Sequence, residues 1–475
     1  MDHTEVLAAT PSPAVDDAPS TQAALGLSTD LYELRMAASY GKRGMVGSAT
    51  FSLFVRRLPP GRRFLVAAGL DLALRGLEQF RFDDEQLAWL GGVGFDREAL
   101  AVLAETSFDG DVWAVPEGTV VFAGEPLIEV TASLPVAQLV ETLVLNQITY
   151  QTAIASKAAR CRLAAVGQGR LVDFSVRRTH GLEAGLAAAR ASAIAGFAGT
   201  SNTEAARRFG LEVVGTMAHS YVEAFPSEQA AFAGLLEDFP DQATLLVDTY
   251  DTEVGLDRAI AAIRATGRTS ERGRGSGVRL DSGDLGRLAR LVRGRLDAAG
   301  LAEAAIVVSS SLDEYEIARL VADRAPIDVF GVGTRMGVSA DAPSLDSVYN
   351  LVEYEGRPIM KLSPGKETTP GPKQVHRFTD LRRDLLAQRA EPTPAGATPL
   401  LEPVMAAGRR IGPGVGSPAE IVAAAMARFD AQLDALPDQF RSLEPGLAYR
   451  VELSEALTEL TRSTRQRLTE AALGP

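Results

Sequence analysis

Between residues 170 and 335 the chain alternates short apolar runs with alanine-rich amphipathic segments, and this alternation constrains its fold more than any other feature. The pattern is typical of repeated β/α units around a parallel sheet. Because the runs end in polar residues or glycine, we expect a barrel with a functional site at the carboxyl ends of its strands rather than an open sheet. The predicted strands are LVDFSV (171–176), LEVVGT (211–216), TLLVDTY (244–250), GVRLDS (277–282), AIVVSSS (305–311) and PIDVFGVGT (326–334).

The sequence on both sides of this region has mixed α and β character. We therefore predict an α/β protein in which an irregular β/α barrel, residues 151–345, is inserted into an α+β domain. That domain would combine residues 28–150 with a C-terminal segment, residues 346–475, that packs on them. Residues 1–27 are rich in Ala, Pro, Ser and Thr and contain no lysine or arginine, so we expect a disordered tail. The polar stretch 268–277 is predicted to be a flexible loop before a barrel strand.

Composition and charge narrow the classes of function. The 475 residues carry a net charge of −13, which disfavours a nucleic-acid-binding protein, since that class usually shows a basic face. No apolar stretch approaches the ~18–20 residues of a membrane-spanning helix, and the N-terminal segment lacks the positive start of a secretory signal. We expect a cytoplasmic protein without membrane partners. A metal centre built from cysteine or histidine is nearly excluded, because these residues are so few: Cys161, His3, His180, His219 and His376.

Chemistry-bearing residues gather where the predicted strands end, and in a β/α barrel these ends meet on one rim. Paired aspartates there could be helix caps, or they could share a Mg²⁺ ion with substrate phosphates, which we favour because neighbouring carboxylates repel. The glycines of FGVGT could bind phosphate or form a simple turn, and the histidine of GTMAHS could be functional or structural. The rim residues are Phe174, Arg177, Arg178, His180, His219, Ser220, Asp248, Asp251, Arg279, Asp281, Ser282, Asp284, Gly331, Gly333 and Thr334.

A series of ordered motifs extends from Ser28 to about Leu460. They are TDLY (29–32), FSLFVRR (51–57), VPEGTVVFAGEPLIEV (115–130), RRTHG (177–181), AGTSN (198–202), GTMAHS (215–220), VDTYDT (247–252), RLDSGDL (279–285), FGVGTR (330–335) and KLSPGK (361–366). In these motifs the chain resembles the nicotinate phosphoribosyltransferases. The resemblance implies a type II phosphoribosyltransferase fold and an enzyme of NAD salvage.

The resemblance also implies a reaction. The enzyme would transfer the 5-phosphoribosyl group from phosphoribosyl pyrophosphate to nicotinate, which gives nicotinate mononucleotide and pyrophosphate. ATP would be a co-substrate whose hydrolysis is coupled to the transfer through a phosphohistidine, and Mg²⁺ would be the cofactor.

Residues for the acceptor follow from the same resemblance. Nicotinate would stack between Phe174 and the partner subunit's Tyr32, which makes the active unit a homodimer with shared sites. Arg177 would hold the carboxylate, with Thr200 and Ser201 nearby. Nicotinamide-using relatives have an aspartate at the position of Ser201, and a carboxylate there would repel nicotinate. Serine therefore favours the acid over the amide.

Residues for the phosphate-bearing substrates are implied in the same way. Arg279 and Asp281 match the pyrophosphate and Mg²⁺ region, supported by Asp248. His219 matches the histidine that ATP phosphorylates, and nearby Asp248 or Asp251 could orient its ring. The residues that match the 5′-phosphate loop are Gly331, Gly333 and Thr334. The residues predicted to bind phosphate or ATP are Arg56, Lys157, Lys361 and Lys366, with Arg57, Arg335 and Lys373 as further members of a basic patch.

One departure from the family pattern and several alternatives remain. Ser311 stands where the family has an aspartate near the ribose hydroxyls, so it can donate a hydrogen bond but brings no charge. It keeps open a weakly active, nucleotide-binding relative of the enzyme. A nicotinamide or quinolinate phosphoribosyltransferase is a second alternative, which Ser201 and the His219 motif argue against. A lyase that uses a lysine Schiff base would need a lysine at a strand end, and the predicted strands carry none.

Overall fold

The computed structural model describes residues 24–266 and 276–473. Most of the predicted tail, with His3, and nearly all of the predicted loop before the fourth strand lie outside the described residues. Residues 24–27 were predicted to belong to the tail, and this is wrong. Ala24 is buried, and the amide of Gly26 donates to the carbonyl of Arg81 at 2.8 Å, so this stretch packs on the folded chain.

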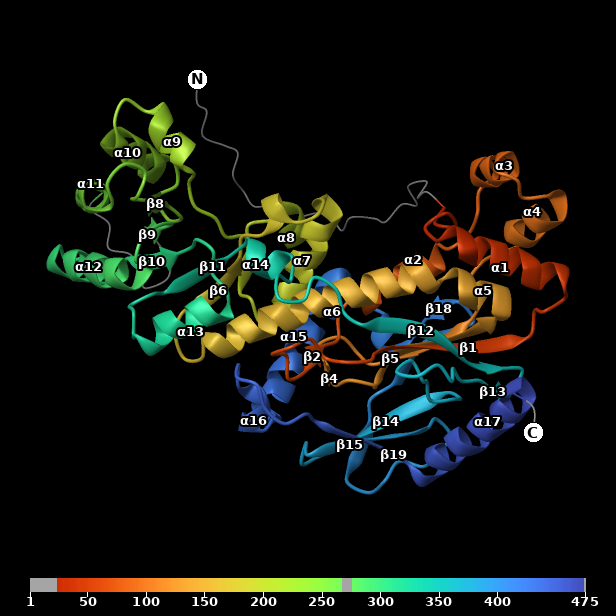
Figure 1. The fold of residues 1–475 in the computed structure, drawn as a ribbon. Coiled ribbons are helices and arrows are strands. Elements are labelled where there is room, and N and C mark those ends of the chain that lie inside the picture. The colour runs from red at the N-terminus through yellow and green to blue at the C-terminus, as the bar shows by residue number, and fades with distance from the viewer. Residues whose placement is uncertain (1–23, 267–275, 474–475) are drawn as a thin grey trace.

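A six-stranded parallel sheet forms the barrel (Figure 1). Strand β8 pairs with β9, β9 with β10, and β10 with β11. Strand β11, the last of the six, then pairs with β6, the first, as the last and first strands of a barrel do. At the other end of the sheet, Thr200 at the end of β7 forms a single bridge with Val213. Among the described residues no pairing joins Val213 to β8, so the ring of strands is not closed there. The prediction of an irregular β/α barrel is confirmed. Its strands are β6 (Arg170–Asp173), β7 (Gly199–Thr200), β8 (Thr244–Leu246), β9 (Gly277–Leu280), β10 (Ala305–Val308) and β11 (Val329–Val332).

Two details of the barrel differ from the prediction. The run 211–216 is not a strand, since Val213 makes a single bridge and its side chain is 61% exposed. Strand β7 was not predicted, because two residues carry no periodic signal. The other strands end before the polar residues that follow them, and many of those residues begin a helix instead.

Helices alternate with these strands, and polar side chains start several of them. Asn202, Ser227, Asp251, Asp284 and Asp313 each accept a hydrogen bond from an amide in the first turn of the helix that follows. The helices are η1 (Val176–Arg178), α7 (Leu182–Ile194), α8 (Thr203–Phe209), α9 (His219–Ala224), α10 (Glu228–Asp238), α11 (Thr252–Ala265), α12 (Leu285–Ala298), α13 (Glu314–Ala322) and α14 (Thr334–Gly337).

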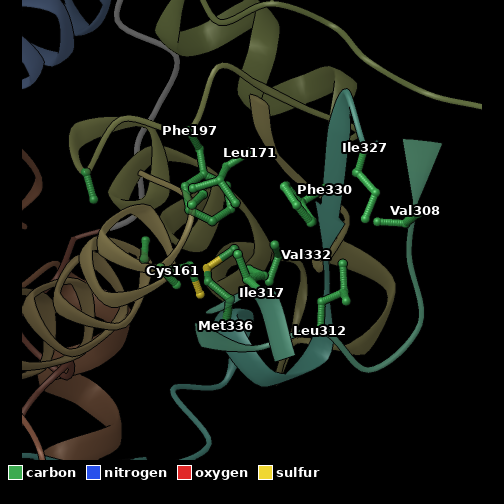
Figure 2. Packing of buried hydrophobic residues seen from close by; sticks show 14 of the residues in the cluster. Cys161, Leu171, Phe197, Val308, Leu312, Ile317, Ile327, Phe330, Val332 and Met336 are labelled. Carbon is green, nitrogen blue, oxygen red and sulfur yellow. The ribbon is translucent and has the colours of Figure 1, made fainter. Parts of the chain in front are cut away.

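The barrel core forms where strand side chains meet helix side chains. Figure 2 shows Leu171 and Phe330 from the strands close to Cys161 of α6 (Glu141–Ala164) and to Ile317 of α13. Burial of this apolar surface holds the strands in register and so fixes the rim above them. Cys161 is fully buried and has no disulfide partner among the described residues.

The rest of the molecule combines both ends of the chain in one seven-stranded sheet, in the order β13–β12–β1–β5–β3–β17–β18. Its strands are β1 (Ser48–Val55), β3 (Asp111–Ala114), β5 (Pro126–Ser133), β12 (Ser347–Tyr354), β13 (Arg357–Pro358), β17 (Glu402–Ala406) and β18 (Arg409–Arg410). Strand β1 pairs with β5 on one side and with β12 on the other, so the C-terminal segment completes the N-terminal sheet. This is the composite α+β domain that the alternation of patterns predicted.

Two smaller sheets and further helices complete this part of the molecule. The remaining strands are β2 (Leu65–Val66), β4 (Val120–Val121), β14 (Lys373–Phe378), β15 (Arg383–Gln388), β16 (Ala397–Pro399) and β19 (Arg450–Leu453). The remaining helices are α1 (Leu31–Lys42), α2 (Leu70–Glu78), α3 (Asp84–Gly92), α4 (Arg97–Ala104), α5 (Leu134–Leu139), η2 (Gly412–Gly414), α15 (Pro418–Ala435), α16 (Asp438–Arg441) and α17 (Glu455–Leu473). No helix in the described ranges combines the length and the apolar character needed to cross a bilayer.

Helix α6 connects the two parts of the molecule. Leu143 and Ile148 pack in the core of the composite domain, whereas Ile154 and Ala158 pack in the barrel core. The predicted boundary between residues 150 and 151 therefore lies inside one continuous helix, and the domain limits stay predictions.

Candidate active site

Arg279 of β9 lies at the centre of the rim and joins three segments. Its Nε–H donates to Ser309 Oγ at 2.8 Å, its Nη1–H to Thr216 Oγ1 at 2.7 Å, and its Nη2–H to Asp281 Oδ1 at 2.8 Å. Thr216 belongs to the loop before His219, and Ser309 follows β10. One guanidinium therefore fixes the relative positions of two strand ends and of the loop that leads to the histidine.

Asp248 and Asp281 face each other across neighbouring strand ends. Asp248 Oδ2 accepts the backbone N–H of Asp281 at 3.0 Å and the hydroxyl of Ser282. Asp248 Oδ1 is buried and has no hydrogen-bond partner among the described residues. Burial raises the pKa of Asp281, but the hydrogen bond from Ser309 and the charge of Arg279 outweigh it and leave that pKa below its ordinary value. Both carboxylates are thus suited to hold a cation.

The other member of each aspartate pair has a different role. Asp251 caps α11 by accepting the amides of Glu253 and Val254, and Asp284 caps α12 by accepting the amide of Arg287. Of each pair, therefore, the second aspartate is a helix cap and the first faces the rim.

His219 is the first residue of α9, not the end of a strand. Its Nδ1 lies 3.2 Å from Thr249 Oγ1, and its Nε2 lies 3.9 Å from Asp281 Oδ2. The prediction that Asp248 or Asp251 orients the ring is wrong, because Thr249 and Asp281 are the neighbours. Thr249 was missed, although it lies between the two aspartates of the VDTYDT motif. With its side chain 43% exposed, the imidazole is accessible and has a carboxylate to stabilise a positive charge.

Phe174 follows β6 and lies against a glycine. A Cβ at Gly331 would lie 2.6 Å from the Phe174 ring, so glycine is required there for the ring to pack. The guanidinium carbon of Arg279 lies 5.8 Å from the centroid of the same ring. Gly331 is inside β11 and paired with Val172, and its phosphate contact stays a prediction. Gly333 precedes α14 and Thr334 is its first residue, and their contact with the 5′-phosphate stays a prediction.

Asp173 is a buried residue that the sequence analysis did not single out. Its Oδ1 accepts the amide of Ser175 at 2.9 Å, and its Oδ2 accepts the Thr200 hydroxyl at 2.7 Å. Burial raises the pKa of Asp173. The Thr200 hydroxyl donates to Asp173 and accepts the amide of Asn202, so both segments hold it in place, and its substrate contact stays a prediction. Ser201 beside it is half-buried, which leaves its side chain partly accessible.

The predicted cations do not gather on the rim. The Nζ of Lys157 lies 2.5 Å from Glu314 and 3.1 Å from Asp341, and its side chain is 3% exposed. Lys157 is thus paired with two carboxylates in this structure, and its phosphate-binding role stays a prediction. Lys373 is likewise buried, beside Glu129.

Arg177 follows β6 close to Phe174, whereas other predicted site residues belong to the composite domain. Arg177 is exposed in η1, and Arg56 pairs with Asp346 at 3.4 Å. Lys361 and Lys366 are exposed in the loop between β13 and β14, and Tyr32 is exposed on α1, at the opposite end of the molecule from β8–β10 (Figure 1). One chain therefore brings together the guanidinium, the two carboxylates, the histidine and the phenylalanine, but not the tyrosine and the two lysines.

The turn after β10 has an unusual backbone. Ser310 has φ 92° and Ser311 has φ 52°, in the left-handed region that non-glycine residues rarely adopt. Both side chains are exposed. Such strain is commonly kept where a functional loop needs it.

Both parts of the chain are similar to proteins of one known family. Residues 27–149 match the N-terminal domain of nicotinate phosphoribosyltransferase (NAPRTase), and residues 169–385 match the NAPRTase family. The chain is 48% identical over 454 residues to nicotinate phosphoribosyltransferase pncB2 of Mycobacterium tuberculosis, which covers 94% of this chain and 96% of that protein.

The chain belongs to the nicotinate phosphoribosyltransferase family.

Two further NAPRTases agree with this assignment. The chain is 44% identical over 363 residues to nicotinate phosphoribosyltransferase of Bacillus subtilis, across 74% of this chain and 73% of that one. Human nicotinic acid phosphoribosyltransferase superposes with a TM-score of 0.80 at 30% identity, across 92% of this chain and 99% of that one. The predicted family and fold class are thereby confirmed. The NAPRTase-family region includes every rim residue named above, and the N-terminal region includes Tyr32 and Arg56.

Proposed function

We propose that this protein is a nicotinate phosphoribosyltransferase of NAD salvage that transfers the 5-phosphoribosyl group of phosphoribosyl pyrophosphate to nicotinate. The observation that carries the proposal is the rim cluster of Arg279, Asp281, Asp248, His219 and Phe174 in a member of this family. It combines an aromatic surface for a flat ring, carboxylates for a cation and an accessible histidine in one place.

The chemistry is a displacement at the anomeric carbon of the ribose. The bond from that carbon to the pyrophosphate oxygen breaks, and a bond to the pyridine nitrogen of nicotinate forms. Positive charge develops on the ribose and negative charge on the departing pyrophosphate. Fixed groups such as the Asp281 carboxylate and the Arg279 guanidinium, already held by hydrogen bonds, stabilise such charges without reorganising.

Mg²⁺ is the cofactor we propose for the pyrophosphate. Within the described ranges no three His, Cys, Asp or Glu side chains form a ready metal site. The unpartnered Asp248 Oδ1 and the carboxylate of Asp281 nevertheless fit an ion that takes one or two carboxylates and completes its shell with substrate phosphates and water. Bound there, Mg²⁺ would neutralise charge on the leaving pyrophosphate.

The direct test of the function is a turnover assay. We expect the purified protein to form nicotinate mononucleotide from nicotinate and phosphoribosyl pyrophosphate, with a faster rate when ATP and Mg²⁺ are present. Nicotinamide and quinolinate should be poor substrates in the same assay. Equal or better use of either alternative acceptor would contradict the proposal, and binding without turnover would indicate the nucleotide-binding relative that Ser311 suggests.

Ser201 is the residue we propose to distinguish the acid from the amide. A Ser201→Asp variant places a carboxylate next to the acceptor carboxylate, and we expect nicotinate kcat/KM to fall at least about tenfold, since one buried like-charge contact exceeds ~1.4 kcal/mol. Ser201→Ala is the matched control and should stay within a few-fold of the wild type. Undiminished nicotinate use by the aspartate variant would remove Ser201 from the acceptor site.

We also propose a homodimer in which the partner subunit's Tyr32 completes the acceptor site. The exposure of Tyr32 and its distance in the fold from Phe174 support this, because the two rings cannot sandwich one acceptor within a chain. We expect Tyr32→Ala and Phe174→Ala proteins to be nearly inactive alone and partly active after mixing, since each mixed dimer would hold one intact site. Subunit exchange is verified by mass measurement of differently tagged chains. Exchange without recovered activity would exclude Tyr32 from a shared site.

A further inference from the structure

A groove of about 360 Å³ lies far from the barrel rim, between α1 and the α3–α4 hairpin. Arg35, Ser39, Lys42 and Arg43 line one wall at helical spacing along α1. The other wall is the α3–α4 connection, which includes Phe95. In Figure 1 this region is at the opposite end of the molecule from α9–α12. The volume is in the range of small-molecule sites.

The packing of α1 on α4 makes the groove a fixed feature. A Cβ at Gly41 would lie 2.5 Å from a methyl of Val102, so glycine lets the two helices approach closely. Asp96 caps α4 by accepting the amide of Ala99 at 2.9 Å, and it also pairs with Lys42 across the groove. A Cβ at Gly94 would meet nothing within 4 Å, which leaves that edge open to solvent.

The charge of the groove opposes that of the chain. The chain carries a net charge of −13, whereas the groove has three cations against the single carboxylate of Asp96. Lys42 is paired with Asp96, but in the described part of the chain neither Arg35 nor Arg43 has a carboxylate within ion-pair distance. Two guanidiniums without ion-pair partners on the same wall of the groove offer the planar sets of N–H donors that bind a phosphate dianion.

The opposite wall is apolar. Val93 is 51% exposed and Phe95 is half-buried, and both line the groove. An aromatic ring of a ligand could pack on these side chains while its phosphate meets the arginines, and the Ser39 hydroxyl could bond a sugar hydroxyl between them. We propose that this groove is a binding site for a mononucleotide, that is, a phosphomonoester joined through a ribose to a flat base. Within one chain the groove lies away from the barrel rim, whereas in the proposed homodimer its Arg35 end, one turn after Tyr32 on α1, lies near the partner's acceptor site. The proposal does not depend on the transfer reaction.

Tryptophan fluorescence can report on the groove alone. The chain has two tryptophans, and Trp89 lies one turn before Val93 on α3. Trp113 is on β3, under the guanidinium of Arg389. A Trp113→Phe background therefore leaves Trp89 as the single fluorophore. The same background with Phe174→Ala shows whether binding at a partner's rim contributes to the signal. The probes are adenosine monophosphate and nicotinate mononucleotide, which distinguish an adenine ligand from the product of the proposed reaction.

We expect at least one probe to change Trp89 fluorescence in a saturable way. In an Arg35→Gln/Arg43→Gln variant the dissociation constant should rise by about tenfold or more. The matched control is Arg97→Gln, an exposed arginine of α4 that does not line the groove, and it should bind as the background does. Circular dichroism and turnover show that each variant is folded.

Three results would overturn the proposal. The first is no saturable Trp89 signal at concentrations well above those that saturate the barrel site. The second is binding that the double variant leaves unchanged. The third is a double variant that sediments at half the mass of the background protein, which would make the groove a contact between two copies of the chain.

Discussion

A His219→Ala variant is expected to lose ATP stimulation of the transfer completely while it retains slow, ATP-independent formation of the mononucleotide. Neutral imidazole is a competent nucleophile near pH 7, and the His219 ring is accessible beside the Asp281 carboxylate, which can stabilise the charged phosphohistidine. The measurement is retention of acid-labile phosphate after brief exposure to γ-labelled ATP, together with turnover with and without ATP. We expect labelled wild-type protein and an unlabelled variant.

Two further variants separate a nucleophile from a structural histidine. Thr249→Val keeps the side-chain shape but removes the hydroxyl near His219 Nδ1, so labelling should slow by roughly tenfold, and Thr249→Ser should restore it. His180→Ala replaces another exposed histidine and should still be labelled and stimulated. Labelling and ATP stimulation that survive in His219→Ala would show that the coupling does not pass through this residue.

An Asp281→Asn variant is expected to lower kcat by about 10²–10³-fold. The amide keeps the shape of the side chain, but it removes the charge that faces Arg279, His219 and the proposed Mg²⁺ site. Because the pKa of Asp281 lies below its ordinary value, the wild-type carboxylate stays ionised through the neutral range. Turnover should therefore fall at every neutral pH, and the Mg²⁺ concentration needed for half-maximal rate should rise.

The matched control is Asp284→Asn, three residues along the same loop. Asp284 caps α12, and asparagine is also a good cap, so we expect a loss of stability below ~1 kcal/mol and nearly unchanged turnover. If both variants lose activity to the same extent, the loss reflects disturbance of the loop rather than the charge of Asp281. If neither does, Asp281 is not part of the transfer site.

The sequence predicted the β/α barrel because each β/α unit has a local pattern of an apolar run followed by an amphipathic segment. Apolar runs end at residues that cannot stay in a buried strand, and those residues, such as Arg279 and Asp281, meet at the strand ends of any parallel barrel. The run 211–216 failed for the same local reason, because its apolar residues imitate a strand that has no partner on its far side.

The contacts between distant segments could not be predicted. In the sequence, Lys157 cannot be distinguished from a lysine on an exposed helix face. Its ion-pair partners Glu314 and Asp341 come from remote segments, so its burial is known only from the tertiary structure. Thr200 is similar, since Asp173, which holds its hydroxyl, belongs to another strand. Residues of this kind look like free binding groups until their partners are known.

The sequence by itself determined the alternation that makes a β/α barrel, the set of polar residues available on its rim and the family motifs that name the reaction. These depend on local order along the chain, which the sequence states directly. The tertiary structure alone decided which aspartate of each pair caps a helix, that Thr249 and Asp281 rather than Asp248 or Asp251 lie beside His219, and that Tyr32 is remote from Phe174 within one chain. The reason is physical: the role of a polar side chain is set by the hydrogen-bond and charge partners that surround it, and here those partners come from other strands and helices.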